Sequence, residues 1–280
     1  MTKRLIVNAD DYGHTPGTCL GIRRAHQEGI VTSTSAMMNR PLASAELTVA
    51  ARTCPDLGVG VHLVLTTGKP VLPADRVATI VDTDGKFLKL DKFCARLETI
   101  DNDHVWAEWN AQVEKFIRHY GKNPDHLDSH HHSSYFTPAL FERMCRLAEQ
   151  LHCAIRKPFG PDSADAADYL PEPLVEVAMR NIGAFTAHPI PPTTDRFIGD
   201  FYDDGATKDH LLAILDELAA DPVHETFELM CHPAAPDHEL GLISDYNSKR
   251  MEELAILQDH AIKESMRELE ISLVNYSALL

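Results

Sequence analysis

Basic side chains are scarce in this sequence. Lysine and arginine number 26 against 42 aspartates and glutamates, which gives a formal net charge of −16 at pH 7, and the acidic residues are spread along the chain. A surface of this sign repels nucleic-acid phosphates and anionic membranes. We therefore expect neither nucleic acid nor a membrane as a partner, which leaves neutral or cationic small molecules as substrates.

The sequence also lacks the features of a secreted or membrane protein. Its six cysteines form no C-x-x-C pair and show no regular spacing, and most stand in apolar surroundings, as buried free thiols do. There is no signal-peptide core at the N-terminus and no apolar run long enough to span a bilayer. These absences predict a cytoplasmic protein.

Several catalytic motifs are absent as well. The sequence contains no G-x-S-x-G element, no P-loop and no dinucleotide-binding glycine motif. It shows no linker, low-complexity tract or internal repeat, and its 44% hydrophobic content is enough for a sizeable core. We interpret residues 1–280 as a single domain with an irregular insertion around residues 70–95, where the periodic pattern loosens.

What the chain does have is an alternation of strand and helix patterns. Strands are expected near residues 5–9, 30–38, 58–65, 126–128, 154–156, 226–231 and 271–276, with helices near 18–28, 44–54, 105–120, 138–151, 208–218 and 247–267. Such alternation predicts a parallel sheet in a barrel-like α/β fold, with the last strand beside the first.

Some local features of this pattern are more specific. Ser44, Thr137 and Thr207 are expected to cap the N-termini of helices, and residues 247–267 are expected to form one long helix. The part of the chain around residues 158–205 is the least readable, with a short helix expected around Leu174 to Met179.

Polar side chains recur where the predicted strands end. The positions are Asp10 and Asp11, His62, Asp128 and His130, Arg156, and His232. The carboxyl ends of parallel strands share one face of a sheet or barrel, so residues far apart in sequence can converge there. Adjacent carboxylates repel unless a cation or a shared proton relieves them. By itself, however, the Asp10–Asp11 pair fits an Asx turn or a helix cap equally well.

The histidines make metal binding the better interpretation. Carboxylate plus imidazole is the ligand set expected for a divalent transition ion such as zinc, and three protein ligands leave a position open for catalysis. Asp11, His62 and His130 all stand where such a site is expected. If the strand pattern continues through the triple histidine, its period of two puts His130 and His132 on one side, with His131 on the other.

Two further positions are ambiguous from spacing alone. His232 fits a satisfied histidine at a strand end slightly better than a catalytic group. Arg156 fits a surface ion pair as well as it fits a site residue.

Six segments together resemble the YdjC-type carbohydrate deacetylases. They are residues 6–13 (IVNADDYG), 29–35 (GIVTSTS), 60–63 (GVHL), 65–70 (LTTGKP), 126–132 (HLDSHHH) and 228–233 (ELMCHP). These segments occur in the order of the family and cover nearly the whole chain. The similarity is greatest to the chitooligosaccharide deacetylase branch, through LTTGKP and MCHP.

The resemblance implies a distorted, TIM-barrel-like (β/α) barrel that binds one divalent metal and removes acetyl groups from N-acetylated amino sugars, commonly as a homodimer. By motif position, Asp11, His62 and His130 would be the metal ligands, Asp10 the catalytic base and His232 the candidate acid. Zinc or magnesium is expected, with cobalt, manganese and nickel also compatible with the ligand set.

The remaining candidates concern ligand orientation and the sugar. Asp128 is expected to orient a neighbouring histidine, while His132, Asn39 and Arg156 are candidates for contacts with the substrate. The sequence departs from the family in having Tyr12 in place of Phe. It also has Ser133 and Ser134 after the histidines where Val and another His are usual. The second departure leaves the identity of the sugar open.

Two other functional classes remain possible on the sequence. A metal-dependent phosphoesterase on a similar barrel would require more basic residues near the site and usually a second metal. A non-catalytic metal- or sugar-binding protein would bind its ligand without turnover.

Overall fold

A computed structural model describes residues 2–157 and 190–280 of the chain. The helix expected around Leu174 to Met179 lies outside these residues. Among the described residues, one sheet contains β1 (Arg4–Tyr12), β2 (Ser33–Ala36), β3 (Gly58–Leu63), β4 (His126–Ser129), β5 (Ala154–Ile155), β6 (Arg196–Ile198), β7 (Thr226–Cys231) and β8 (Ser272–Val274).

The strand order follows the expected alternation. It runs β5-β4-β3-β2-β1-β7-β6, every named pair is parallel, and β8 pairs with the first half of β1 while β2 pairs with the second half. The predicted parallel sheet, and the pairing of the last strand with the first, are confirmed. From Leu5 onward, β1 is buried along its whole length, as expected for a strand with both faces covered.

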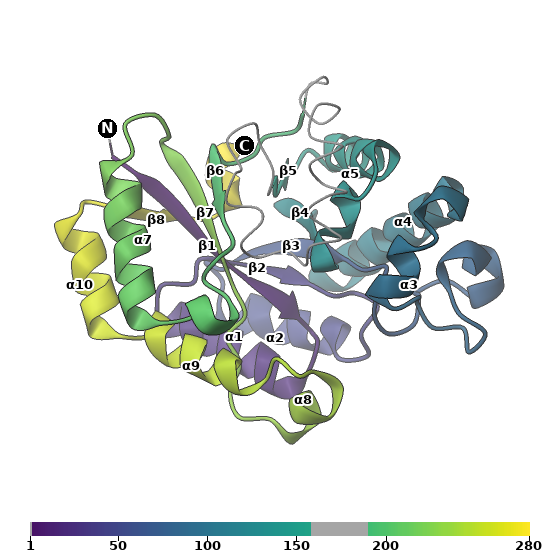
Figure 1. Cartoon of the computed structure of the whole chain (residues 1–280), viewed down its shortest axis with the longest axis horizontal. Coiled ribbons are helices and arrows are strands. Elements are labelled where there is room, and N and C mark those ends of the chain that lie inside the picture. Colours follow the sequence, from purple (N-terminus) through teal and green to yellow (C-terminus); the bar gives the residue numbers. More distant parts are fainter. Residues whose placement is uncertain (1, 158–189) are drawn as a thin grey trace.

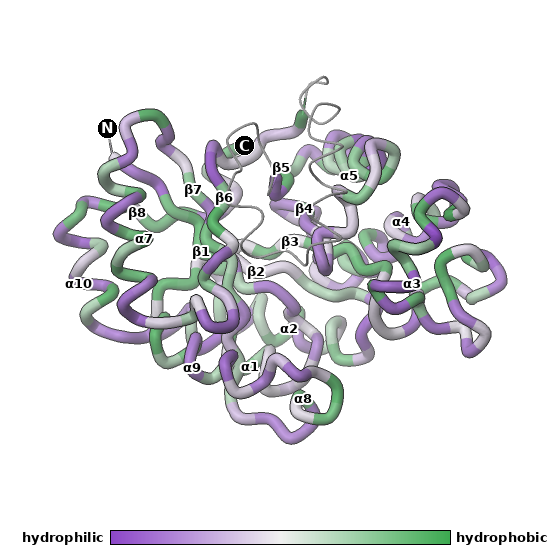
Figure 2. The backbone as a smooth tube through the Cα atoms, viewed as in Figure 1, coloured by the Kyte–Doolittle hydropathy of each residue, from purple (hydrophilic) through white to green (hydrophobic). Residues whose placement is uncertain are grey.

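Helices connect the strands and surround the sheet (Figure 1). They are α1 (Pro16–Gln27), α2 (Ala43–Thr53), α3 (Leu90–Cys94), α4 (Asn102–Tyr120), α5 (Pro138–Leu151), α7 (Lys208–Ala220), α8 (His238–Ile243), α9 (Ser248–Leu257) and α10 (His260–Glu268). Figure 2 shows the central part of β1 as hydrophobic, whereas the peripheral helices alternate between hydrophobic and hydrophilic stretches. None of the helices in the described ranges has the length and apolar character needed to cross a bilayer.

The sheet is strongly curled. Arg156 directly follows β5 at one end of the sheet, yet its guanidinium bonds to Asp10 on β1 at 2.6 Å and to Glu228 on β7 at 2.7 Å. In a flat sheet the four steps from β5 to β1 would span about 19 Å, which is too far for such a contact. The strands therefore form a half-barrel whose interior contains these side chains, which confirms the predicted distorted (β/α) barrel class.

Two of the three expected helix caps are present. The hydroxyls of Thr137 and Thr207 each accept a hydrogen bond from a backbone N–H in the first turn of the following helix. Ser44 is not a cap, because α2 already begins at Ala43 after a turn, and its N-cap Leu42 makes no side-chain bond. The sequence interpretation placed the start of the helix too late because Leu42, at the N-cap, is not one of the usual capping side chains.

The single helix expected over residues 247–267 is two helices. The chain breaks between α9 and α10 at Asp259, whose backbone is extended and whose carboxylate accepts a hydrogen bond from the Ala261 N–H. Asp259 thus caps α10, a role that competes with continuing the helix through it. The hydrophobic periodicity of the two helices masked this break.

Candidate metal centre and catalytic cavity

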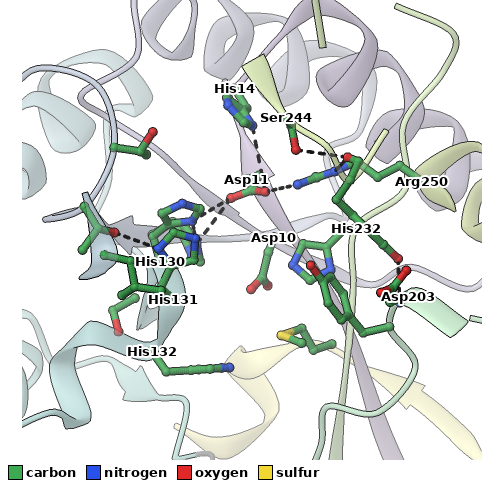
Figure 3. A pocket seen from close by; sticks show the side chains of 18 of the residues that line it. Asp10, Asp11, His14, His130, His131, His132, Asp203, His232, Ser244 and Arg250 are labelled. Atoms are coloured by element: carbon green, nitrogen blue, oxygen red, sulfur yellow. Dashed lines mark hydrogen bonds and ion pairs between the residues drawn. The ribbon is translucent and has the colours of Figure 1, made fainter. Parts of the chain in front are cut away.

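The carboxyl ends of the strands open into a polar cavity of about 870 Å³. Of the site residues predicted from sequence, those that line it are Asp10, Asp11, His62, His130, His132 and His232. Figure 3 shows His130 and His131 on one wall, Arg250 and His232 on the opposite wall, and the two aspartates between them. The fold therefore brings together the ends of strands that are far apart in the sequence.

A β-bulge in β1 contains the two adjacent aspartates. β1 pairs Ala9 with Thr34 and Tyr12 with Ala36, so β1 has one residue more than β2 across this interval. Asp11 has φ +70°, in the left-handed region that non-glycine residues seldom occupy. Bulges of this kind redirect side chains next to functional sites. As a result, Asp10 and Asp11 have different partners.

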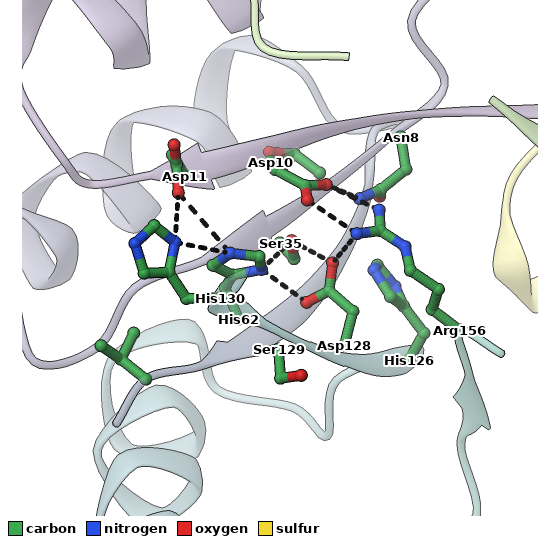
Figure 4. Close-up of polar contacts among 12 residues, drawn as sticks. Asn8, Asp10, Asp11, Ser35, His62, His126, Asp128, Ser129, His130 and Arg156 are labelled. Atoms are coloured by element: carbon green, nitrogen blue, oxygen red, sulfur yellow. Dashed lines mark hydrogen bonds and ion pairs between the residues drawn. The ribbon is translucent and has the colours of Figure 1, made fainter. Parts of the chain in front are cut away.

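Asp11, His62 and His130, the ligand triad, bring three donor atoms together (Figure 4). Asp11 Oδ1 lies 3.5 Å from His62 Nε2 and 3.2 Å from His130 Nδ1, and the two ring nitrogens are 3.3 Å apart. Ligands bound tetrahedrally at about 2.0–2.1 Å lie about 3.3–3.4 Å from one another. Asp11 Oδ1 is also buried with no hydrogen-bond donor among the described residues. The triad thus fits three corners of a tetrahedral metal site with the fourth corner open.

The other nitrogen of His62 is held by a carboxylate. His62 Nδ1 lies 2.8 Å from Asp128 Oδ1, and the Ser35 hydroxyl donates to Asp128 Oδ2 at 2.8 Å. A carboxylate at Nδ1 fixes the tautomer that presents Nε2 to a metal. Burial lowers the pKa of His62, but the charge of Asp128 and its neighbours raises it to about 9. Asp128 therefore lies beside His62, where its carboxylate can fix the tautomer of the ring.

Asp10 is held in place by Arg156. The guanidinium donates to both Asp10 oxygens, at 2.6 and 2.7 Å, and the Asn8 amide donates to Oδ1 at 2.8 Å. Burial would raise the pKa of Asp10, but the Arg156 charge lowers it below the ordinary value. Asp10 is consequently a fixed, ionised carboxylate at the cavity wall, the state that a general base requires.

Arg156 itself is fully buried and does not line the cavity. Besides Asp10 it contacts Glu228 at 2.7 Å and Asp128 at 3.2 Å. We call these four residues the Arg156 cluster. Asp10, His62 and Asp128 also have the spacing of a metal site, but the guanidinium already supplies the positive charge there. The geometry thus supports one metal rather than two.

Asn39 likewise lies outside the cavity lining. Its side-chain amide donates to the backbone oxygens of Thr67 and Lys69, at 2.8 and 3.2 Å. It fixes the loop that follows β3, whose Thr66 and Thr67 do line the cavity.

The triple histidine does not continue the strand. β4 ends at Ser129, and His131 and His132 have φ +56° and +53° in a 3₁₀ segment, His130–Tyr135. The predicted alternation is therefore wrong: the His130 and His131 rings lie 3.9 Å apart, centroid to centroid. Consecutive left-handed residues store strain, which is typical of functional sites.

His232 follows β7 and is partly buried. Its backbone N–H donates to the Glu253 carboxylate, and its ring meets Tyr202 edge-on with centroids 5.4 Å apart. Burial and the nearby charge of Arg250 lower the pKa of His232 to about 4. The resting side chain is therefore neutral at pH 7.

Sequence reasoning missed two charged residues on α9. Arg250 donates to Asp11 Oδ2 at 2.6 Å, and Glu253 accepts from the Tyr246 hydroxyl as well as from His232. Both side chains are buried, and burial raises the pKa of Glu253 to about 7. The only available signal was a pair of charged residues on a helix face that otherwise packs inward.

Several known proteins are similar to this chain along nearly its whole length. The model of a family described as YdjC-like protein matches residues 4–268. A carbohydrate deacetylase from Enterococcus faecalis V583 is 34% identical over 279 residues, covering 99% of this chain and 98% of the relative. A chitooligosaccharide deacetylase from Salmonella paratyphi B is 34% identical over 268 residues, covering 96% of each chain.

A solved structure shows the same fold. It is the crystal structure of an E. faecalis V583 protein described as a candidate cellobiose-phosphate cleavage protein, which aligns with a TM-score of 0.85 at 33% identity. The alignment covers 100% of this chain and 99% of the other.

Proposed function

The chain belongs to the YdjC-like protein family, and we propose that it hydrolyses the N-acetyl group of N-acetylglucosamine units in chitobiose or short chitooligosaccharides. The products are acetate and a free amino sugar. The observation that carries this proposal is the fixed, ionised Asp10 beside the ligand triad, because amide hydrolysis needs a base next to a centre that activates water. The names of the deacetylase relatives support the substrate class.

In this proposal Asp11, His62 and His130 hold one divalent ion. Their near-tetrahedral spacing favours zinc over magnesium, which prefers octahedral oxygen sites. When bound, such an ion lowers the pKa of water and polarises a carbonyl oxygen. Asp128 and Ser35 keep His62 in the ligating tautomer throughout.

Asp10 serves as the general base. It accepts a proton from the attacking water, and Arg156 holds the carboxylate so that its orientation is set before the substrate arrives. Removing Arg156 would leave the Asn8 amide as the remaining donor to Asp10 and would raise the pKa of Asp10.

His232 donates the proton that the leaving nitrogen requires, since an amide nitrogen cannot depart as an anion. Because its pKa of about 4 makes the resting ring neutral, the ring must first receive a proton. The proton that Asp10 takes from the water is available in the same cavity, and the charge of Asp10 is one of those that raise the pKa of His232. His232 Nδ1 is buried and has no hydrogen-bond partner among the described residues, so it is open to this exchange.

Phosphoester hydrolysis is the less favoured chemistry. Arg250 is the one arginine or lysine lining the cavity within residues 2–157 and 190–280, and it is already paired with Asp11. A second metal would have to displace Arg156 from its three carboxylates. We also propose a cytoplasmic homodimer on the family resemblance, and light scattering of the purified protein measures the oligomeric state.

The test is acetate release from N,N′-diacetylchitobiose by protein as purified, after chelation and after re-addition of single metals. Asp10→Asn should lower the rate about 10²- to 10⁴-fold, while Asp84→Asn, at an exposed turn, should match the wild type. Metal-loaded, folded protein that releases no acetate would refute the assignment. Phosphate release from sugar phosphates, measured in parallel, would identify the rival reaction.

A further inference from the structure

The three guanidinium nitrogens of Arg250 differ in their hydrogen-bond partners. Nη2 donates to Asp11 Oδ2 at 2.6 Å, and Nε donates to the Tyr246 backbone oxygen at 3.0 Å. Nη1 is buried and has no partner among the described residues, although the side chain lines the cavity. A buried guanidinium nitrogen without an acceptor, on a side chain that lines a cavity, indicates a ligand that supplies the missing acceptor.

The position of Arg250 is fixed from several sides. The ring of Tyr246 lies 5.4 Å from the guanidinium carbon, and the backbone oxygen of Arg250 accepts from Ala234 in the loop after β7. Only 5% of the residue's surface is exposed. Figure 3 shows the side chain extending from the wall opposite His130 toward Asp11. Its geometry is thus set by the fold before any ligand binds.

The contact with Arg250 gives the two Asp11 oxygens separate roles. Oδ2 is taken by Arg250, so only Oδ1 remains to face His62 and His130. The other basic side chains near Asp11, His14 and Arg40, donate no hydrogen bond to its carboxylate. His14 Nδ1 is 4.0 Å from Oδ2, and burial lowers the pKa of His14 to about 3, so it is neutral. Arg40 senses the Asp11 charge but makes its hydrogen bond to the His14 backbone oxygen.

We propose that Arg250 is a positioning residue that fixes Asp11 as a one-oxygen metal ligand and donates Nη1 to an oxygen of the bound sugar. The second half of this proposal rests on the deacetylase function proposed above, whereas the first requires only that the ligand triad binds metal. The two halves are therefore separable by experiment.

Zinc affinity of metal-stripped protein, measured by competition with a chelating dye, tests the first half without any turnover. Arg250→Gln should raise the zinc Kd about 10- to 100-fold, as removal of a group that orients a metal ligand does. Arg250→Lys retains one charged donor and should recover most of this loss. Arg40→Gln removes a comparable charge with no bond to Asp11 and should leave the Kd unchanged.

Zinc binding that is equal or tighter in Arg250→Gln than in the wild type would overturn the positioning role. It would mean that repulsion between the Arg250 charge and the zinc ion cancels or outweighs any gain from orienting Asp11. Thermal unfolding of each metal-free variant separates this result from misfolding. If Arg250→Gln does not fold, Arg250→Met takes its place, because it keeps the aliphatic part of the side chain and removes every donor to Asp11; a zinc Kd equal to that of Arg40→Gln would then overturn the first half.

Calorimetric titration of N,N′-diacetylchitobiose into the zinc-loaded Asp10→Asn protein tests the second half. Adding Arg250→Lys should weaken sugar binding about 10-fold or more, the loss expected for one charged hydrogen bond, while zinc affinity stays near that of the wild type. Unchanged sugar affinity would refute the Nη1 contact. If the wild type binds zinc but neither binds nor deacetylates the sugar, the proposed function fails while the first half stands.

Discussion

Replacing Arg156 by methionine would remove the guanidinium that contacts three buried carboxylates. Asp10, Asp128 and Glu228 lie 2.6, 3.2 and 2.7 Å from its nitrogens. Burial raises the pKa of Glu228 even with Arg156 present, so this group can be neutralised by a proton. The charge of Arg156 helps to hold the pKa values of Asp10 and Asp128 below their ordinary value, so its removal leaves Asp10 buried with only the Asn8 amide as a donor and Asp128 with His62 as its charged partner. Breaking a buried pair in this way typically costs about 3–5 kcal/mol.

The free-energy loss converts to a measurable change in melting temperature. For 280 residues, an unfolding entropy of about 2.1 cal/mol/K per residue gives about 0.6 kcal/mol/K. A loss of about 3–5 kcal/mol therefore lowers Tm by about 5–9 °C, measured by calorimetry on metal-free protein. Arg143→Met is the matched control, because it breaks an ion pair at 3.0 Å with Asp103, whose side chain is 86% exposed. That change should cost less than about 1 kcal/mol.

A second substitution separates stability from chemistry. Adding Glu228→Gln to Arg156→Met replaces the carboxyl that must otherwise take up a proton and should recover part of the lost Tm, whereas acetate release should stay low because Asp10 still lacks the guanidinium that orients it. An Arg156→Met protein that melts within 2 °C of the Arg143→Met control, with the 2 °C margin set at about 1 kcal/mol, would refute the charge-compensation argument.

Three further results are expected. Asp128→Asn should weaken zinc binding about 10- to 100-fold, because His62 loses the partner that sets its tautomer; an unchanged Kd in isothermal titration would contradict this. Zinc at 100 to 1,000 times its Kd should stabilise the metal-free wild type by about 2.7–4.1 kcal/mol, seen as a higher Tm, and His130→Ala should abolish the effect. Gly60→Ala should destabilise the sheet by about 1–3 kcal/mol, because the new Cβ would lie 2.4 Å from His126 Cε1 on the adjacent strand; urea unfolding measures the loss.

The ligand triad was predictable from sequence for a topological reason. Asp11, His62 and His130 each lie at or near the end of a predicted strand, and the alternation of strands and helices implied that those strands are parallel. Parallel strands bring their carboxyl ends to one edge. The expectation therefore needed the element types and their order, but no detail of side-chain geometry.

The orientation of the histidines was not predictable in the same way. The two-residue period applies only while the backbone stays extended, and β4 ends at Ser129, before the first of them. The left-handed conformation of His131 and His132 follows from tertiary packing rather than from their own preference. Arg250 escaped detection because it stands 239 positions from Asp11, on a helix whose periodicity indicated only packing.

The buried charges of the site fall into two groups that His62 joins. Its Nε2 faces Asp11 and its Nδ1 faces Asp128, so one ring touches both the ligand triad and the Arg156 cluster. Because each aspartate of the adjacent pair has its own arginine, Asp10 with Arg156 and Asp11 with Arg250, the repulsion between them is relieved without a shared proton. Arg156 engages both oxygens of Asp10, whereas Arg250 engages only one oxygen of Asp11. That difference leaves a carboxylate oxygen without a donor at Asp11 alone, which is why two identical neighbours can divide into the base and the metal ligand that we propose.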